Sequence, residues 1–324
     1  RTDALPRSAL APMAAKQPGF WFSDFVFEKG RVRVPTTTGD MALDWLLITD
    51  ALRWFTYYLM VRAGGWWNAW RKPSGLKIWF TPAPPRPWYI VWAATVWAGI
   101  GFAKEQSGAD AILYFEDQTC AAPVFPAGLR VLNGKCPDVS KSTVARVVEE
   151  SFGYPLALDP TTWQGDAVEK GELNGVHDGR LVRCPTARLP GKTYQRLIDT
   201  AEDDGMVCDL RTATVAGKPI LVFVKRKPAE GRFSIQNKTV VVRLPEEIFP
   251  PAELEQISRF CAAMNLDWGG LDILRERGTR RLYVVDVNKT DTGPAVILSW
   301  KDRVRVTTLL ANALTDLVRA TRAS

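Results

Sequence analysis

A stretch of apolar and acidic residues from Leu266 to Pro294 constrains the fold more than any other part of the chain, because it predicts a β-hairpin that carries two carboxylates. Asp272 lies within an apolar strand, and a β-branched strand ends on Asp286 and Asn288. The segment 277–281 is rich in Gly and Arg, which suits a hairpin turn. Pairing these strands brings the two acids together, and carboxylate and amide oxygens are ligands that suit Mg²⁺. A hairpin whose acids are simply solvated is the alternative, and the spacing alone leaves both interpretations open.

The composition describes a globular chain with an excess of positive charge. Of the 324 residues, 46% are hydrophobic and 24% are charged, which excludes a disordered protein. This length suffices for two or three lobes. The net charge of +7 favours anionic ligands, but no dense run of Lys and Arg marks a nucleic-acid-binding arm. We therefore expect no nucleic-acid partner.

The cysteine pattern argues against a structural zinc site. Five cysteines are widely spaced, without a Cys-x-x-Cys pair or a Cys/His cluster: Cys120, Cys136, Cys184, Cys208 and Cys261. Their odd number indicates reduced thiols, and no signal peptide is visible. Both observations predict a cytoplasmic location.

Residues 1–74 are predicted to form a Trp-rich, largely helical N-terminal extension, and ten of the 13 tryptophans precede residue 100. A helix is expected over residues 41–62 with Asp40 as its N-cap. It is apolar on more than one face, but four charged residues interrupt it, so no transmembrane span is expected. Tryptophans beside Arg71 and Lys72 suit packing between lobes or between subunits of a homo-oligomer, which we favour. They also suit a peripheral contact with a membrane.

Residues 75–137 are predicted to form a small βαβ-like lobe. The segment 77–81 is a short apolar strand, 88–103 is an uncharged stretch at helical spacing, and 109–115 is a second strand. Alternation of strand, helix and strand predicts a parallel pairing.

Two lysines in the next segment are placed to bind anions. Residues 139–152 predict an amphipathic helix with Lys141 at its N-terminus, where free N–H groups and the helix dipole attract negative charge. Lys135 is a rival for the same role. Residues 166–170 predict a strand that ends on Lys170. Either lysine is equally consistent with a surface side chain when it is considered alone.

A Gly-containing loop follows that strand. Gly175 gives the loop freedom to close and lets backbone N–H groups approach a phosphate. His177, the only histidine in the chain, lies in this loop. It is either a surface residue or a proton donor or base beside a phosphate.

The order of these elements resembles the ATP-grasp superfamily. After the lysine strand and the Gly loop come Gln195-x-x-Ile198, the triplet Asp209-Leu210-Arg211, and the acidic hairpin. The triplet is similar to that of the glutamate-adding ligases within the superfamily. A salt bridge between Arg211 and Asp209, which share a strand face, is the alternative role for the arginine.

The resemblance implies an α/β (α+β) fold. It implies an ATP-grasp domain over residues 138–324, built from α+β subdomains at about 138–195 and 196–324, with the lobe 75–137 preceding it. Helices are expected over residues 246–264 and 300–321, where apolar residues recur at helical spacing. The segment 232–237 departs from the pattern of the ligases, which leaves the substrates unnamed.

The resemblance also implies roles for individual residues. Nucleotide contacts are implied for a set that runs from that helix to the hinge strand around Gln195-x-x-Ile198, which joins the two subdomains: Lys141, Lys170, Gly175, Gln195, Arg196, Leu197 and Asp199, with Asp203 and Asp204 as rivals for the ribose. Catalytic contacts to the transferred phosphoryl and acyl groups are implied for Arg211, His177 and Lys170. Metal binding, of Mg²⁺ or of Mn²⁺ in its place, is implied for Asp272, Asp286 and Asn288. Asp286 stands where the superfamily usually has Glu.

The predicted function is an ATP-dependent ligase that activates a carboxylate as an acyl phosphate and joins it to an amine. Its substrates are expected to be a small-molecule or peptide carboxylate and an amine. The sequence has no Gly-x4-Gly-Lys-Ser/Thr element, which argues against a P-loop enzyme. Two alternatives stay open: an ATP-grasp kinase acting on a hydroxyl, and a non-catalytic nucleotide-binding scaffold that docks through the Trp-rich N-terminus.

Overall fold

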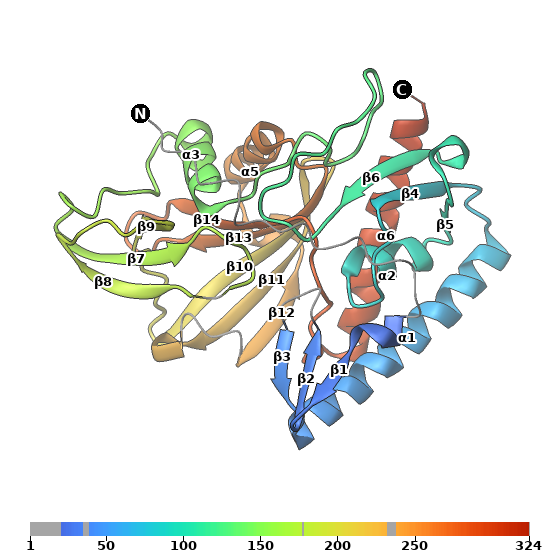
Figure 1. Ribbon diagram of the computed structural model, residues 1–324, viewed down its shortest axis with the longest axis horizontal. Helices are drawn as coiled ribbons and strands as arrows, with labels where there is room; N and C mark the ends of the chain where they lie inside the picture. Colours follow the sequence, from blue (N-terminus) through green and yellow to red (C-terminus); the bar gives the residue numbers. More distant parts are fainter. Residues whose placement is uncertain (1–20, 35–38, 177, 232–237, 324) are drawn as a thin grey trace.

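The structure is a computed structural model that describes residues 21–34, 39–176, 178–231 and 238–323 (Figure 1). Its centre is a five-stranded antiparallel sheet in the order β12-β11-β10-β13-β14. The strands are β10 (Met206–Val215), β11 (Lys218–Pro228), β12 (Thr239–Arg243), β13 (Trp268–Arg275) and β14 (Leu282–Asn288). The predicted hairpin is therefore confirmed, and Asp272 lies opposite Asp286 in the register.

Two helices close one face of this sheet. A core cluster joins α3 (Lys141–Phe152) and α5 (Pro251–Met264) to apolar residues of β10, β11, β13 and β14. The expected single helix over residues 246–264 is wrong, because the chain forms α4 (Pro245–Ile248) and then α5. Phe249 is extended between the two helices, since a residue that precedes a proline is disfavoured in the α region.

A second, three-stranded antiparallel sheet lies beside α3 and β14 (Figure 1). Its order is β8-β7-β9, with β7 (Gly165–Gly171), β8 (Arg180–Cys184) and β9 (Lys192–Arg196). The predicted strand that ends near Lys170 is β7. This sheet therefore carries the lysine and the hinge toward the five-stranded sheet.

The preceding lobe is a parallel sheet with one crossing helix. Strand β4 (Lys77–Pro82) pairs with β5 (Gly101–Phe102) and β6 (Ala111–Phe115), and α2 (Ile90–Trp97) crosses between them. The parallel pairing was predicted, but the helix expected over residues 88–103 is half that length. Gly99 adopts φ +64°, a left-handed conformation typical of a helix end, and the chain then enters β5.

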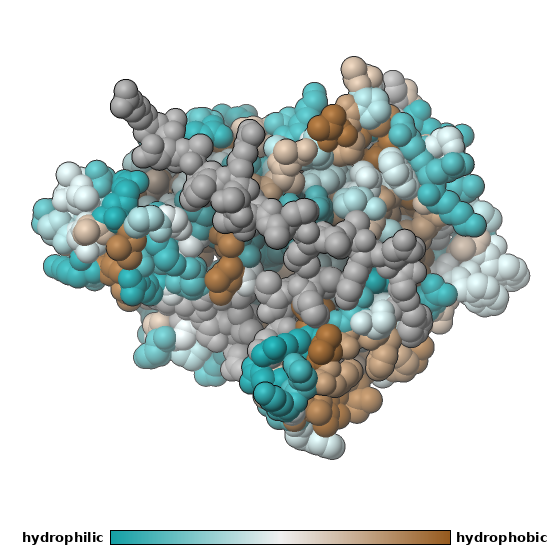
Figure 2. Space-filling model, in the orientation of Figure 1, coloured by the Kyte–Doolittle hydropathy of each residue, from teal (hydrophilic) through white to brown (hydrophobic). Residues whose placement is uncertain are grey.

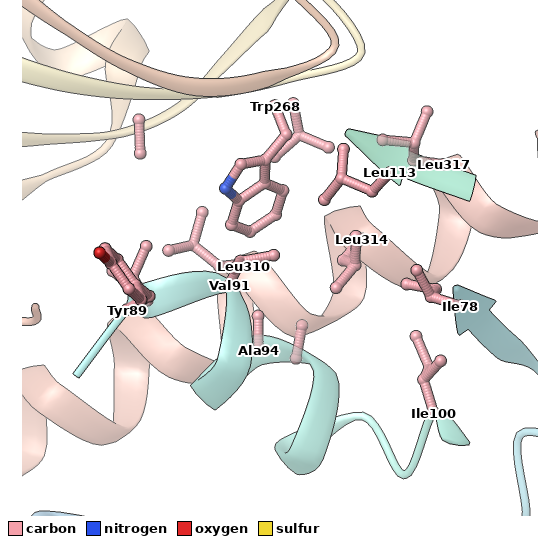
Figure 3. Packing of buried hydrophobic residues seen from close by; sticks show 14 of the residues in the cluster. Ile78, Tyr89, Val91, Ala94, Ile100, Leu113, Trp268, Leu310, Leu314 and Leu317 are labelled. Carbon is pink, nitrogen blue, oxygen red and sulfur yellow. The ribbon is translucent and has the colours of Figure 1, made fainter. Parts of the chain in front are cut away.

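This lobe shares its hydrophobic core with the last helix, α6 (Trp300–Arg322). Figure 3 shows Ile78, Leu113 and the α2 residues facing Leu310 and Leu314 of α6, with Trp268 of β13 above them. Residues from the first and last thirds of the chain thus complete one core, and α6 also contacts β10 and β11.

The N-terminal region differs from its prediction. A three-stranded sheet of β1 (Val26–Glu28), β2 (Arg31–Val34) and β3 (Gly39–Ala42) precedes the long helix α1 (Trp45–Arg71). A helix capped by Asp40 is wrong, because that residue pairs with β2 in extended backbone. The N-cap is Asp44, whose Oδ1 accepts a hydrogen bond from the Leu47 amide at 2.8 Å.

Helix α1 packs on α2 and α6 through a narrow inner face. Tyr57, Val61 and Gly65 are buried, and the Tyr57 hydroxyl lies 2.7 Å from Thr307 Oγ1 of α6. A Cβ at Gly65 would meet the side chain and backbone of Val96 in α2, so only glycine allows this approach. Among the described residues, no helix is both long enough and apolar enough to cross a bilayer.

Candidate active site

A row of charged side chains crosses one face of the five-stranded sheet. Arg211 on β10 lies opposite Asp272 on β13, which lies opposite Asp286 on β14. The Arg211 Nη1 atom is 2.8 Å from Asp272 Oδ2, and its Nη2 atom pairs with Asp291 in the loop after β14. Lys141 Nζ, from α3, pairs with Asp286. Cations and carboxylates therefore alternate across three strands and the adjoining helix.

Lys141 is held at the first position of α3. Ser140 caps this helix and accepts a hydrogen bond from the Thr143 amide, so the helix begins at Lys141 and not at residue 139 as predicted. The Lys141 side chain is 9% exposed, and its ammonium donates to Asn174 Oδ1 as well as to Asp286. A cation is disfavoured at the positive end of a helix dipole unless an anion lies nearby. Asp286 provides that anion here, and a phosphate would do the same.

Lys170 lies on β7 beside this row. Burial, together with the charge of Lys141, lowers the pKa of Lys170 to about 8, against the opposing effect of Asp286 and Asp272. The lysine lines a cavity of about 70 Å³ between the two sheets. The apolar walls of this cavity come from both sheets, as Val168, Leu197, Val207, Leu274 and Val285.

Gln195 lies at the floor of the same cavity. Its side chain is 1% exposed, and its Nε2 atom is buried without a hydrogen-bond partner among the described residues. The neighbouring Arg196 amide already donates to Leu156 O at 2.9 Å, and its guanidinium lies over the Trp163 ring. A buried unsatisfied donor costs about 1–3 kcal/mol, so a ligand acceptor such as a purine nitrogen would fit Gln195.

The predicted ribose acids do not line the cavity. Asp199 Oδ1 accepts from the Ala201 amide at 2.9 Å, and its neighbour Thr200 lines the cavity instead. Asp203 pairs with Arg277 at 2.7 Å on the surface. Asp204 is similarly engaged with an arginine of β11. Sequence reasoning could not distinguish these acids, because it did not show which of them the turn after β9 uses for its own hydrogen bonds.

Beside Asp209 the structure places two lysines that the sequence interpretation did not single out, Lys225 and Lys227. Asp209 pairs with Lys227 at 3.0 Å rather than with Arg211, so the predicted alternative role for Arg211 is wrong. Burial raises the pKa of Asp209 against the opposing effect of Lys227, and burial lowers the pKa of Lys225. These residues alternate along β10 and β11, so a period of two on paired strands was the signal that could have found them.

Asp291 fixes the orientation of Arg211. Its carboxylate holds one side of the guanidinium while Asp272 holds the other. A Cβ at Gly270 would collide with the Asp291 carboxylate and come within 3.0 Å of Arg211 Nε. Glycine at position 270 therefore leaves the space in which this pair forms.

The electrostatics keep Asp272 ionised. Burial alone would raise its pKa, but the charges of Arg211, Lys225 and Lys141 lower the pKa of Asp272 to about 2. This carboxylate carries its negative charge at every pH at which the protein is expected to work, which is the state that a metal ligand needs.

The end of the hairpin is tied to the preceding lobe. Asn288 Oδ1 accepts from the Thr290 amide at 2.9 Å, and Thr290 Oγ1 donates to Asp117 at 2.8 Å. Tyr89, at the start of α2, donates to the other oxygen of Asp117 at 3.2 Å. The loop after β14 is therefore anchored where the lobe meets the charged row.

The donor set fits a hard divalent cation in chemistry but is small. Across the parts of the chain that the structure describes, no group of three or more His, Cys, Asp or Glu forms a metal-ligating cluster. Asp272 and Asp286 lie opposite one another, and Asn288 follows on the same strand, so the set offers two carboxylates and an amide oxygen. Lys141 and Arg211 neutralise the two acids in this structure.

The Gly loop is only partly described. Gly175 adopts φ +75°, which suits a turn. Asn174 anchors the loop, because its amide accepts from Lys141 and donates to Val287 O at 2.8 Å. His177 and the divergent segment 232–237 lie outside the described residues.

No family model matches, and no curated protein matches. Solved structures of ATP-grasp ligases do match. The ATP-grasp ligase PsnB, complexed with precursor peptide PsnA2 and AMPPNP, has a TM-score of 0.49 at 12% identity, covering 78% of this chain and 99% of PsnB.

Two further matches have similar coverage. A RimK domain protein ATP-grasp from Sphaerobacter thermophilus has a TM-score of 0.45 at 11% identity and covers 75% of this chain and 99% of its own. D-alanine–D-alanine ligase from Bacillus anthracis has a TM-score of 0.43 at 12% identity, with coverages of 76% and 99%. In its match to PsnB with a minimal precursor, this chain spans 64% of that protein. These are likenesses of fold, and the chemistry of the site follows from the side chains described above.

Proposed function

We propose that this protein is an ATP-dependent ligase that activates a carboxylate as an acyl phosphate and joins it to an amine. The observation that carries the proposal is the junction of two features. One is a cavity with an unsatisfied buried donor, and the other is the charged row, which lies beside Lys170 and Asp209 in the cavity lining. The cavity suits a base and the row suits phosphates and an acyl group.

The nucleotide base would bind between the two sheets. Gln195 Nε2 offers a donor, and Leu274 and Val285 face Val168 and Leu197 as apolar walls. The cavity of about 70 Å³ is smaller than a ligand pocket of roughly 300–1,000 Å³. Nucleotide binding therefore requires the β7–β9 sheet to move away from the five-stranded sheet, a motion typical of enzymes that close over their substrates.

The phosphates would bind where two lysines and a helix N-terminus converge. Lys141 lies on the first turn of α3, and Lys170 approaches from β7. Anionic oxygens would stabilise both ammonium groups, which is why the lowered pKa of Lys170 should return upward when phosphate binds. The two lysines would neutralise charge that develops as the γ-phosphoryl group leaves.

The acyl group would form at Arg211. A carboxylate oxygen of the substrate attacks the γ-phosphorus, ADP leaves, and the amine then attacks the acyl carbon with release of phosphate and a proton. Carboxylates fix this guanidinium on both sides, so its remaining N–H donors keep one orientation. A bidentate contact with two oxygens of an acyl or phosphoryl group requires such a fixed orientation. Asp291 is the positioning residue for this arginine.

Asp272, Asp286 and Asn288 would hold Mg²⁺, or Mn²⁺ in its place. A bound divalent ion would neutralise phosphate charge. Asp272 is already ionised, so it would bind the cation without first losing a proton.

Product analysis tests the proposal. Purified protein with Mg-ATP is offered pairs of amino acids and short peptides, and ADP, phosphate and the organic product are quantified. A ligase releases ADP and phosphate in equal amounts only when both substrates are present, and the product contains a new amide bond. A phosphorylated product without free phosphate would support the kinase alternative and overturn the ligase.

Nucleotide binding is measured separately, because it does not depend on knowing the substrates. Titration calorimetry with Mg-AMPPNP should give binding to the wild type and at least ten-fold weaker binding to Lys170→Met. Lys218→Met, at the exposed β10–β11 turn, is the matched control and should bind as the wild type.

If Asp286→Ala turns over at the wild-type rate, Asp286 is not a metal ligand.

A further inference from the structure

Helix α1 carries an apolar stripe on the side that faces away from the rest of the molecule. The side chains of the stripe are between 40% and 76% exposed, although all are large and apolar: Trp45, Ile48, Leu52, Phe55, Leu59, Trp66 and Trp70. Figure 2 shows hydrophobic surface over the part of α1 at the bottom of the view, beside the more hydrophilic β1–β3 sheet. Such a continuous patch on a soluble chain marks an interaction site.

The stripe is separate from the face that α1 already buries. Tyr57, Val61 and Gly65 pack inward on α2 and α6, and their positions lie on the opposite side of the helical wheel from Leu52 and Leu59. The helix is therefore apolar on two opposite faces, and the described part of the chain covers only one of them.

The spacing of the stripe matches that of a helix partner. Trp45, Ile48, Leu52, Phe55 and Leu59 are separated by alternating steps of three and four residues. Such a 3.5-residue period is the seam of two helices packed along their length. It continues at residue 66, and α1 is 27 residues long, about 40 Å at 1.5 Å per residue.

The exposed area is large enough for a stable interface. An aromatic side chain buries about 150–250 Å², so four exposed aromatic residues and three aliphatic ones present on the order of 1,000 Å². A standard interface needs roughly 800 Å² from each partner. One helix can therefore supply a whole interface.

The charges on α1 complement a second α1 in the opposite direction. Asp44 is the N-cap of α1 and Arg71 is its last residue, whereas Asp50 pairs within the helix with Arg53. In an antiparallel pair the acidic end of one helix meets the basic end of the other, and the helix dipoles oppose. A twofold axis near the middle of the stripe then places Trp45 beside Trp70 of the other copy.

We propose that α1 pairs with the α1 of a second copy of this chain, antiparallel and about a twofold axis, so that the protein is a homodimer. This interface is independent of the proposed ligase activity, because the stripe is on the far side of α1 from the core that α2 and α6 share with the sheet. The competing occupant is an anionic membrane surface, because α1 also carries Arg53, Arg62 and Arg71, and vesicle binding separates the two.

The mass in solution tests the pairing. The expected mass by light scattering is twice 36.1 kDa for the wild type at micromolar concentration. The double variant Leu52→Lys with Leu59→Lys should be a monomer, and its thermal midpoint should show that it is folded, because neither leucine contacts the core. Val124→Lys is the matched control, since Val124 is 93% exposed away from α1, and should remain a dimer. A monomeric wild type, or a dimer that survives the double variant, overturns the proposal.

Cross-linking tests the orientation. In a Cys120→Ser background, which removes the exposed thiol, chains carrying Trp45→Cys are mixed with chains carrying Trp70→Cys and oxidised. The antiparallel pair predicts cross-links between the two kinds of chain, and a predominance of links between like chains overturns it. The wild type is also sedimented with phosphatidylserine and with phosphatidylcholine vesicles. Binding as a monomer to either would replace the homodimer with a membrane contact.

Discussion

One face of the five-stranded sheet has a charged half and an apolar half, which lie on the same strands but have different roles. Asp209 and Arg211 lie on β10 in the charged row, whereas Ala213 and Val215, further along the same face of that strand, are buried in the core with α2 and α6. The two halves meet on β10 between Arg211 and Ala213. The sheet itself is continuous across both halves. The apolar half is shielded from water because a helix covers it.

The two halves also differ in how they fail. In the apolar half, a lost side chain leaves a cavity whose cost depends on volume. In the charged half, a lost side chain leaves a partner whose charge is no longer neutralised, and the cost depends on what remains. Four experiments separate these two kinds of loss.

Loss of Arg211 should have the largest effect. Arg211→Met leaves Asp272 and Asp291 facing each other without their cation, so we expect a destabilisation of about 3–5 kcal/mol. Turnover of the folded fraction should fall by about 10²–10³. Denaturant unfolding and phosphate release measure the two effects.

The control for this variant is Arg183→Met, which breaks an exposed pair with Asp166 and should cost no more than about 1 kcal/mol. The pH dependence gives a further check. Because the pKa of Asp272 is lowered to about 2 in the folded state, its contribution to stability is present above pH 4 and lost as pH falls toward 2. Arg211→Met should lose most of this dependence, and an unchanged acid profile would contradict the pairing.

In the apolar half, Leu314→Ala should cost about 2–5 kcal/mol, because Leu314 of α6 is fully buried between the lobe and the sheet. Affinity of the folded protein for Mg-AMPPNP should stay within two-fold of the wild type, by calorimetry. Leu189→Ala, at a 43% exposed position, is the control and should cost little. A loss of nucleotide affinity that parallels the loss of stability would show that the two halves are coupled.

A methyl group added where the two halves meet should disturb the charged row without leaving any charge unpaired. Gly270→Ala places a Cβ against Asp291 and Arg211, so we expect about 1–3 kcal/mol of destabilisation and a larger proportional loss of turnover. Gly278→Ala has open space and is the control. Equal turnover in the two variants would show that Asp291 does not position Arg211.

The smallest expected effect concerns the proton on Lys170. Burial lowers its pKa to about 8, so the lysine loses its charge as pH rises through that value, and affinity for Mg-AMPPNP should fall by up to about ten-fold between pH 7 and 9.5. In Lys170→Met this dependence should disappear. The sign for stability is opposite: the unfolded state holds more protons between pH 8 and about 10.5, so the same deprotonation makes the folded state more stable.

The hydrophobic period of each segment and the order of the segments along the sequence predicted much of this arrangement. The hairpin, the strand that carries Lys170, and the helix that begins at Lys141 are local, and each has its signal within about fifteen residues. Asp286 lies opposite Asp272 because antiparallel pairing leaves little choice once the turn is placed. The order of these motifs along the chain indicated the resemblance to the ATP-grasp superfamily.

What the sequence could not supply was the choice among equivalent local options. Asp40 and Asp44 are both acceptable helix caps, and strand pairing with β2 decided between them. Asp209 and Asp272 were both within reach of Arg211, and Lys227, on the neighbouring strand β11, pairs with Asp209. Asp291 has no pattern of its own, because its role depends on an empty space at Gly270.

The core that joins the preceding lobe to α6 has a consequence for biosynthesis. Ile78 and Leu113 are buried against Leu310 and Leu314, across about two hundred residues of chain. While the ribosome is still producing the sheet, the lobe made earlier has no partner for its apolar face, since contacts of such long sequence separation form late. We therefore expect nascent chains to expose this apolar face until α6 has been made.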